Sequence, residues 1–290
     1  MTPPPGWTSE SEPFELLETL GSGGFATTYK ARVLDEDLAE AWGCNIVAII
    51  VPLGRKQERL LAKQVEMNGL LHIQAANIVP YLGLCVFHGQ IVLAKQFIPG
   101  GSLRGMIGSV GVQKPLPLDQ AIEIAEGTLA GLAAIHRRRI LHRDIKPENI
   151  LMDGRVPKID PGFLWVLDSN EQASVTGTLF YMSPELLDME GASFRSDIWS
   201  FGVTLYEMVT GVIPFGDMRA PVGVILDNIR RAEIRPPREL RPDIPEELDR
   251  IIMKALERPL ERRFRTADEM LEDLRAWRHG TTSEANEQSR

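Results

Sequence analysis

The sequence predicts an α+β protein of two lobes, in which a strand-rich first third is followed by a helix-rich remainder. Before Pro99 the apolar runs are short and rich in β-branched residues, whereas after it apolar residues recur every three or four positions over long stretches. Pro99, Gly100 and Gly101 stand where the pattern changes, which indicates a hinge. A ligand is then expected in the cleft between the two lobes.

Each element is assigned from its own pattern. In the first lobe, the apolar and β-branched runs at 45–51 and 90–98 predict strands, and the segment at about 57–71 predicts a helix between them. In the second lobe, apolar residues spaced by three or four lie on one helix face over 118–136. Further helices are expected over 198–210, 245–256 and 266–277.

The composition is that of a folded globular protein. Hydrophobic residues make up 43% of the 290 residues and charged residues 25%, which excludes a wholly disordered chain. Lys and Arg number 32 against 40 Asp and Glu, a net charge of −8, so general attraction to nucleic acid is not expected. Cys44 and Cys85 are too few for a disulfide framework, and both are expected in buried strands, so a reducing cytoplasm is the predicted location.

The folded domain is expected over 14–279, with lobes at 14–98 and 99–279. Residues 1–13 are Pro-rich and polar, without the basic start and apolar run of a targeting segment, and residues 280–290 are almost devoid of apolar side chains. Both ends are expected to be disordered tails. The most apolar long stretch, 198–215, is interrupted by polar residues and predicts a buried helix, not a membrane span.

The first chemical signal is a glycine-rich segment that follows a Leu-rich strand, Gly21-Ser22-Gly23-Gly24-Phe25-Ala26-Thr27-Thr28-Tyr29. Glycines let a backbone approach phosphate oxygens closely and direct its N–H groups at them. Taken alone, the segment is equally compatible with a glycine-rich hairpin turn.

A second motif is much more specific, Leu141-His142-Arg143-Asp144-Ile145-Lys146-Pro147-Glu148-Asn149-Ile150-Leu151. It resembles, at every defining position, the catalytic loop of the serine/threonine protein kinases, and the glycine-rich segment precedes it at the right distance. The resemblance covers roughly 14–279 and is strongest to bacterial kinases of the eukaryotic type. It implies the two-lobed kinase fold, with a small antiparallel-sheet lobe that has one main helix and a mainly helical large lobe, and it implies ATP and Mg²⁺ as cofactors.

The resemblance also implies a role for each catalytic-loop residue. Asp144 would accept the proton of the substrate hydroxyl, Lys146 would stabilise the transferring phosphoryl group, and Asn149 would hold a magnesium ion. Thr178 would bond to Asp144 and Lys146 and shape the peptide site. Nucleotide contacts are implied for Gly21, Ser22, Gly23, Gly24, Phe25, Thr28, Ala48, Lys95 and Leu151.

Four further residues are expected to act structurally or in regulation. Arg143, beside Asp144, would capture a phosphate on the activation loop, for which the acceptors would be Ser169, Ser174 or Thr176. Asp197 would hold the backbone of the catalytic loop. Glu185 would pair with Arg263.

The sequence departs from the family pattern on the third strand. The lysine that holds the α- and β-phosphates of the nucleotide is replaced by Ile50 in Val47-Ala48-Ile49-Ile50-Val51. The resemblance implies that Glu66 is the helix glutamate that pairs with this lysine in the family. A buried carboxylate without a partner is costly, so Glu66 must find another cation, turn to water or be protonated.

A second departure affects the metal-binding Asp-Phe-Gly motif, where the chain has Asp160-Pro161-Gly162-Phe163. Without a gap, Pro161 replaces the metal ligand and Gly162 the packing phenylalanine. With a one-residue deletion, Asp160 is the metal ligand and survives. The ungapped register is preferred because Lys158 then keeps its usual distance, but the sequence leaves both open.

One unexpected cation could compensate. Lys95 falls at the rear of the nucleotide pocket, where an apolar residue is normal, and from there its ammonium could reach Glu66 or a phosphate. A one-residue slip in the register would instead place Lys95 on the outer face of its strand.

With Ile50 and Pro161 unable to act, the rate of phosphoryl transfer should fall on the order of a thousandfold or more. The preferred hypothesis is therefore a catalytically impaired pseudokinase that binds nucleotide or a protein partner in signalling. The alternative is an atypical active kinase acting on protein Ser or Thr, in which Lys95 and Asp160 compensate. A scaffold without nucleotide is a third hypothesis. The expected partner is a protein substrate or a signalling protein, and neither a nucleic-acid partner nor a membrane span is expected.

Overall fold

The structure is a computed structural model that describes residues 12–68, 73–108, 114–161, 178–216 and 220–280. Within these ranges, the side chains of Gln64, Glu66, Met67, Asn68 and Thr178 lie outside the description. The chain forms two compact units, of which the first ends at Pro99 and the second begins at Gly100. This is the place where the pattern of the sequence changes.

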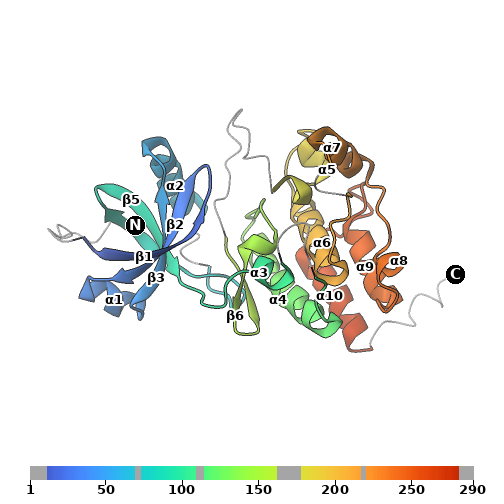
Figure 1. The fold of residues 1–290 in the computed structure, drawn as a ribbon, viewed down its shortest axis with the longest axis horizontal. Coiled ribbons are helices and arrows are strands. Elements are labelled where there is room, and N and C mark those ends of the chain that lie inside the picture. The colour runs from blue at the N-terminus through green and yellow to red at the C-terminus, as the bar shows by residue number, and fades with distance from the viewer. Residues whose placement is uncertain (1–11, 69–72, 109–113, 162–177, 217–219, 281–290) are drawn as a thin grey trace. The chain divides into compact units, whose positions relative to one another are not determined.

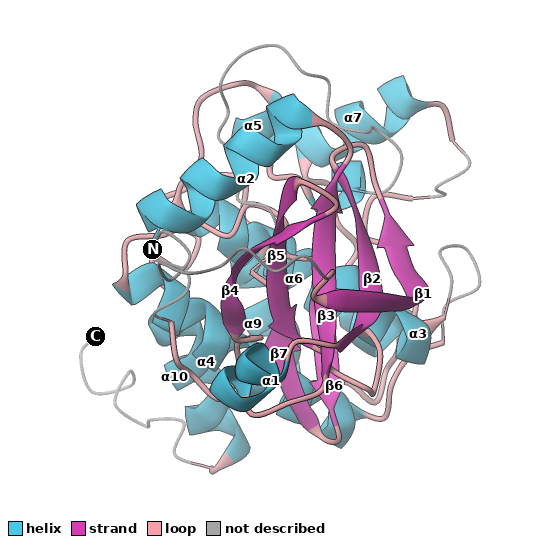
Figure 2. Ribbon diagram, turned by 90° about the vertical axis from the view of Figure 1, so that its left-hand side faces the viewer, coloured by secondary structure: helices cyan, strands magenta, loops and turns pink. Residues whose placement is uncertain are grey.

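The first unit is built on five strands and two helices (Figure 1). In chain order they are β1 (Phe14–Ser22), β2 (Ala26–Val33), α1 (Glu36–Trp42), β3 (Ile46–Pro52), α2 (Arg55–Asn68), β4 (Tyr81–Phe87) and β5 (Gln90–Gln96). The strands form one antiparallel sheet in the order β1-β2-β3-β5-β4 (Figure 2). The predicted antiparallel lobe is confirmed.

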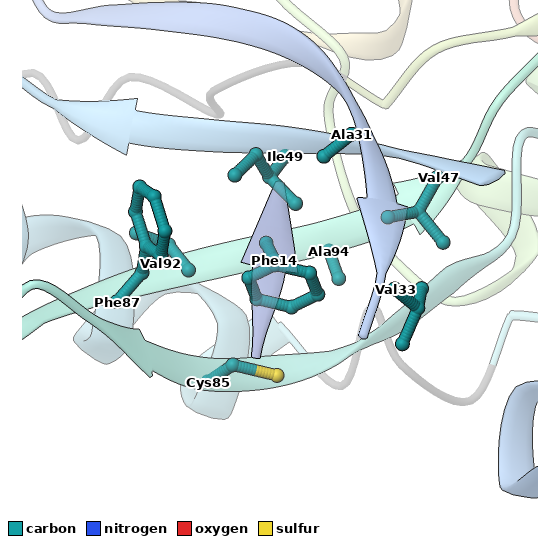
Figure 3. Packing of buried hydrophobic residues seen from close by; sticks show 9 residues of the cluster. All are labelled: Phe14, Ala31, Val33, Val47, Ile49, Cys85, Phe87, Val92 and Ala94. Atoms are coloured by element: carbon teal, nitrogen blue, oxygen red, sulfur yellow. The ribbon is translucent and has the colours of Figure 1, made fainter. Parts of the chain in front are cut away.

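One face of this sheet carries a hydrophobic core to which every strand contributes. Its buried members are Phe14, Ala31, Val33, Val47, Ile49, Cys85, Phe87, Val92 and Ala94 (Figure 3). Phe14 and Phe87 come from the two outer strands of the order, and their rings meet edge to face at 6.0 Å. The sheet therefore curls until its outer strands meet at this end.

Helix α1 packs on this core and is one of the helices that the sequence patterns did not predict. Asp35 caps its N-terminus by accepting a hydrogen bond from the Leu38 N–H at 3.0 Å, and Gly43 ends it with a φ of 64°. Trp42 stacks on Phe14 with ring centroids 6.1 Å apart. Seven residues are too few for a periodicity to stand out, so only the two caps signal this helix.

The start of the first unit and the position of one of its two cysteines differ from the sequence prediction. Glu12, placed in the tail by its composition, accepts a hydrogen bond from the backbone N–H of His88 at 3.0 Å. Cys85 is buried in β4, but Cys44 lies after α1 and is only half-buried, not in a buried strand. Burial raises the pKa of Cys85 to about 12, so this thiol is inert at neutral pH.

The second unit is mainly helical (Figure 1). Its elements are α3 (Leu103–Ile107), α4 (Leu118–Arg137), η2 (Pro147–Asn149), β6 (Ile150–Asp153), β7 (Val156–Ile159), η3 (Thr178–Tyr181), α5 (Pro184–Leu187), α6 (Phe194–Thr210), α7 (Val222–Arg231), α8 (Pro237–Leu240), α9 (Glu246–Ala255) and α10 (Ala267–Arg278). The predicted helices correspond to α4, α6, α9 and α10. Helix α6 is buried along almost its whole length. Within the described ranges, no helix has the length and hydropathy needed to cross a bilayer.

Candidate active site

The loop before η2 is fixed by a single buried carboxylate. Asp197, in the first turn of α6 and 1% exposed, accepts hydrogen bonds from the backbone N–H groups of His142 at 2.8 Å and Arg143 at 2.7 Å. The Nε2 atom of His136 lies 2.9 Å from the same carboxylate. Arg143 has a φ of 64°, a strained backbone conformation for a residue other than glycine. The hydrogen bonds to Asp197 offset that strain and fix the backbone of the loop immediately before Asp144.

Three polar side chains converge at Asp144. Lys146 Nζ lies 2.9 Å from Asp144 Oδ1, and Asn149 Nδ2 lies 2.7 Å from Oδ2. Asn149 Nδ2 also donates to the backbone oxygen of Asp144 at 2.7 Å. The η2 turn, in which the Asn149 N–H donates to the Lys146 oxygen at 3.0 Å, brings the three residues together. The result is a half-buried carboxylate that is oriented by a cation and an amide.

Asp160 is anchored beside this group by its backbone. Strands β6 and β7 pair Ile150 with Ile159, so the chain leaves β7 next to Asn149. The Asp160 N–H donates to the Asn149 oxygen at 2.9 Å, and the Asp160 oxygen lies 2.8 Å from His142 Nε2. Asp160 is half-buried, whereas Pro161 is buried.

Asn149 and Asp160 suit a magnesium ion. Because Asn149 Nδ2 donates to the two oxygens of Asp144, Oδ1 is the atom of this amide that can accept or ligate. Mg²⁺ prefers oxygen ligands and is usually held by one or two side chains together with phosphates. Among the described side chains there is no cluster of three or more His, Cys, Asp or Glu that would form a complete metal cage. Two side chains of this kind could hold the ion only together with water molecules or phosphate oxygens.

The glycine-rich segment forms the hairpin between β1 and β2. Ser22 pairs with Thr27, and the Gly23 N–H donates to the Ala26 oxygen at 3.1 Å. A Cβ added at Gly21, Gly23 or Gly24 would meet no atom of the described chain within 4 Å, and none of the three has a positive φ. Neither packing nor backbone conformation therefore requires glycine at these three positions.

Strand register places Lys95 on the same face of the sheet as Ala48 and Ile50. Ala48 is directly opposite Lys95 in the β3–β5 ladder, and Ile50 is opposite Leu93. Residues that alternate with these, Val47 and Ile49, belong to the core on the other face. Lys95 is 5% exposed and Ile50 2% exposed, so neither lies on the outer surface.

The expected ion pair of Glu185 with Arg263 is present and buried. Arg263 Nη1 lies 2.9 Å from Glu185 Oε1, and Ser196 Oγ donates to the same oxygen at 2.8 Å. The guanidinium also lies over the Trp199 ring at 4.9 Å. Burial alone would raise the pKa of Glu185, but the hydrogen bond and charge of Arg263 outweigh it and hold the pKa below its usual value.

A second buried charge network was not singled out from the sequence. Arg104 of α3 lies 2.7 Å from Glu207, which is 0% exposed, and 2.8 Å from Glu148 of the catalytic loop. Tyr181 donates to Glu207 at 2.6 Å and bonds to Arg104 as well. Glu207 lies among apolar residues of α6, so the sequence pattern gives no sign that it is a buried charge. Nothing in the local sequence points to Arg104 as its partner.

Several predicted residues lie outside the description. The side chains of Glu66 and Thr178 are not described, although Glu66 belongs to α2 and Thr178 begins η3. Gly162 and the predicted phosphate acceptors, Ser169, Ser174 and Thr176, fall in 162–177. Of the remaining nucleotide-site residues, Phe25 and Thr28 are half-buried in the β1–β2 hairpin region, and Leu151 is half-buried in β6.

An antiparallel sheet unit, a mainly helical unit and a loop built on Asp144, Lys146 and Asn149 define a protein kinase domain, and the model of the family described as "Protein kinase domain" matches residues 14–274. A probable serine/threonine-protein kinase of Clostridium perfringens is 33% identical over 268 residues, covering 90% of this chain and 38% of that protein. Serine/threonine-protein kinase PrkC of Bacillus subtilis is 29% identical, with 90% and 40% covered. Serine/threonine-protein kinase PknB of Mycobacterium leprae is 32% identical, with 98% and 46% covered. The chain belongs to the serine/threonine protein kinase family.

The chain spans less than half the length of these relatives. The match concerns the kinase domain, so it bears on the fold and on the class of chemistry.

Proposed function

We propose that this chain transfers the γ-phosphate of ATP to Ser or Thr of a protein substrate, as an atypical kinase whose nucleotide site differs from the family pattern. The observation that carries the proposal is the constellation at Asp144, in which Lys146 and Asn149 orient the carboxylate at 2.9 and 2.7 Å. A domain that had lost phosphoryl transfer would have no need to keep this arrangement for stability, because the three groups are only half-buried.

Each residue has a definite task in this mechanism. Asp144 accepts the proton of the attacking hydroxyl, and Lys146 stabilises the negative charge of the transferring group as a point charge. Asn149 Oδ1 and the Asp160 carboxylate would hold Mg²⁺, which when bound offsets the charge of the phosphates. The backbone anchoring of Asp160 beside Asn149 supports the deletion register, in which Asp160 and not Pro161 is the metal ligand.

The glycine-rich hairpin supports nucleotide binding for a separate reason. Gly21, Gly23 and Gly24 are required neither by packing nor by φ, so their selection points to a ligand that approaches the backbone closely. The cytoplasm, where ATP and protein substrates meet, is the compartment that suits this activity.

The second candidate is a pseudokinase that binds nucleotide or a partner without turnover. It is favoured by one observation, the replacement of the third-strand lysine by Ile50, which is 2% exposed and packed. In this case Asp144 would be retained without being used.

The test combines nucleotide binding with phosphoryl transfer. For the wild-type chain we expect ATP to raise the unfolding temperature only when Mg²⁺ is present, and ³²P from γ-labelled ATP to reach protein Ser or Thr. Asp160→Asn should remove the Mg²⁺ dependence of the ATP-induced rise in unfolding temperature. Asp153→Asn, at the far end of the β6–β7 hairpin, is the matched control and should keep that dependence. Asp144→Asn should abolish transfer and preserve binding.

The outcomes separate the hypotheses. Binding of ATP without transfer, unchanged in Asp144→Asn, contradicts the proposed activity and supports the pseudokinase. Transfer that survives Asp144→Asn indicates a contaminating kinase. A thermal shift that needs no Mg²⁺ argues against Asp160 as a metal ligand, and the absence of any shift supports the scaffold.

A further inference from the structure

Arg104 joins the catalytic loop to the interior of the second unit. It lies in α3, and its guanidinium connects two carboxylates of different exposure: Glu207 of α6, whose side chain is 0% exposed, and Glu148 of η2, whose side chain is 41% exposed. Nη1 lies 2.7 Å from Glu207 Oε1, Nη2 lies 3.2 Å from Glu207 Oε2, and Nε donates to Glu148 Oε1 at 2.8 Å. No step of the proposed phosphoryl transfer uses this arginine.

The buried end of this network holds the guanidinium in one orientation. Arg104 donates to both oxygens of Glu207, and its Nη2 also bonds to the hydroxyl of Tyr181 in η3. Burial and the charge of Glu207 raise the pKa of Tyr181, so its hydroxyl stays protonated and donates a hydrogen bond to Glu207 Oε2 at 2.6 Å. Because a guanidinium is planar and rigid, these contacts also fix the direction of the Nε–H bond.

The exposed end of the network therefore restricts the position of a catalytic-loop residue. Glu148 is the central residue of η2 and directly precedes Asn149, whose amide donates to Asp144 Oδ2 at 2.7 Å. An ion pair with so exposed a carboxylate contributes little to stability, because water and salt screen it. It nevertheless ties the η2 turn to the buried helix α6, since the guanidinium that it contacts is held there.

We propose that Arg104 is a positioning residue for phosphoryl transfer, which holds the η2 turn through Glu148 so that Asn149 keeps its contact with Asp144. The inference rests on the proposed function in one respect, that Asp144 is the base. It adds that position 104 requires a guanidinium and not merely a positive charge. An ammonium is a compact point charge, which cannot serve both carboxylates in one fixed geometry.

The alternative role for Arg104 is compensation of the buried charge of Glu207 alone. Removing one partner of a buried ion pair is strongly destabilising, so a loss of activity in Arg104→Met would not separate the two roles. Two other substitutions separate them. Arg104→Lys retains a cation for Glu207, and Glu148→Gln removes only the exposed carboxylate.

The first experiment measures kcat and KM of the full chain for ATP and for dephosphorylated casein as the acceptor protein. Arg104→Lys and Glu148→Gln should each lower kcat about tenfold or more and change either KM by less than about threefold, since the base is misplaced while binding contacts remain. The double variant should be no slower than the slower single variant. Arg155→Gln, which breaks an exposed pair with Glu123, is the matched control and should leave kcat unchanged.

Two kinetic results would overturn the inference. A higher KM for casein with an unchanged kcat would mean that Glu148 contacts the substrate. Additive losses of kcat in the double variant would mean that Arg104 and Glu148 act separately.

The second experiment needs no activity, because it measures amide hydrogen exchange at Asn149. The Asn149 N–H donates to the Lys146 oxygen at 3.0 Å within the η2 turn, so its exchange reports the opening of that turn. Arg104→Lys and Glu148→Gln should each raise its exchange rate by about tenfold and leave the amides of α4 unchanged. Exchange at Asn149 that is unchanged in both variants would overturn the inference.

The two proposals fail in different ways. Faster exchange at Asn149 in a chain that shows no phosphoryl transfer would support the hold of Arg104 on the η2 turn and contradict the proposed activity. Transfer that is indifferent to both Arg104→Lys and Glu148→Gln would overturn the inference and leave the proposed function intact.

Discussion

Three aspartates of the second unit differ in what they can do because their neighbours differ. Asp197 is buried and accepts two backbone N–H groups, so its charge is fully engaged in holding the loop. Asp144 is half-buried between Lys146 and Asn149, which orient its carboxylate and leave part of it accessible to solvent. Asp160 is positioned by its backbone, whose N–H donates to the Asn149 oxygen and whose oxygen lies 2.8 Å from His142 Nε2.

At the residue scale, Lys95 and Glu66 are predicted to form an ion pair when no nucleotide is bound. Helix α2 contacts β5, and Lys95 faces away from the core of Phe14 and Ile49. Lys95→Met and Glu66→Leu should each destabilise the chain by a few kcal/mol, and the double variant should recover much of the loss, a coupling of about 1–3 kcal/mol. Denaturant unfolding of the four proteins measures this coupling.

The control for this cycle is Lys56→Met, which removes an exposed lysine ten residues before Glu66 in the same helix, beyond the reach of an i,i+3 or i,i+4 pair. It should show no coupling with Glu66→Leu. Additive effects of Lys95→Met and Glu66→Leu would mean that the two side chains do not meet.

The pair of Glu185 and Arg263 predicts a pH dependence of stability. Since the pKa of Glu185 in the folded chain is below its usual value of 4.5, the pair contributes stability that is fully present above that value. The contribution is lost as the pH falls through the lower, folded pKa. Glu185→Gln should therefore be less stable than wild type at pH 7, by about 3–5 kcal/mol for a broken buried pair.

The difference between these two proteins should shrink as the pH is lowered from 5 towards the folded pKa of Glu185. Denaturant unfolding at a series of pH values tests this directly, and the comparison cancels the titration of the other carboxylates. A difference that stays constant down to the acid unfolding of the chain would contradict the prediction.

At the element scale, the segment at 100–102 pairs with β6 and depends on one glycine. The Met152 N–H donates to the Gly101 oxygen at 2.8 Å, and Ser102 bridges to Leu151. A Cβ at Gly100 would lie 2.1 Å from the Met152 oxygen, which is a backbone atom that cannot move aside on its own. Gly100→Ala should therefore destabilise the second unit by about 2–4 kcal/mol.

Gly105→Ala is the matched control for this substitution. Gly105 lies in α3, and an added Cβ meets no described atom within 4 Å. Alanine is the better helix former, so this variant should be neutral or stabilised by up to about 1 kcal/mol. Thermal unfolding of both variants provides the comparison, and equal stabilities would show that the segment at 100–102 adjusts without cost.

The elements also show which features a single sequence can predict. Helix α4 was predicted over 118–136 and spans Leu118–Arg137, because twenty residues give the apolar spacing room to be recognised. Helix α6 starts at Phe194, four residues before its predicted start, because its first turn is polar and holds Asp197. Helix α1 was missed because it is short and because its apolar residues pack on a core that only the folded sheet creates.

At the scale of the whole molecule, motifs were more informative than patterns. Two short segments around Gly21 and Asp144 were sufficient to predict the kinase fold, which the match over 14–274 confirms. The sequence did not decide between Asp160 and Pro161 at the metal-ligand position, and the spacing from Lys158 favoured the ungapped register with Pro161. The β6–β7 ladder places residue 160 beside Asn149, which supports the role proposed for Asp160. The network of Arg104 and Glu207 joins positions 103 residues apart and has no local signal.

The hydrogen bonds from the catalytic loop to Asp197 affect how fast two amide hydrogens exchange with solvent. Loops without regular structure usually exchange within the time of local fluctuations, because their N–H groups have no ladder to protect them. The amides of His142 and Arg143 instead donate to the carboxylate of Asp197, which belongs to the buried helix α6. We expect them to exchange only when these bonds to the first turn of that helix break, so the two amides should exchange more slowly than other loop amides and should report the opening of that turn.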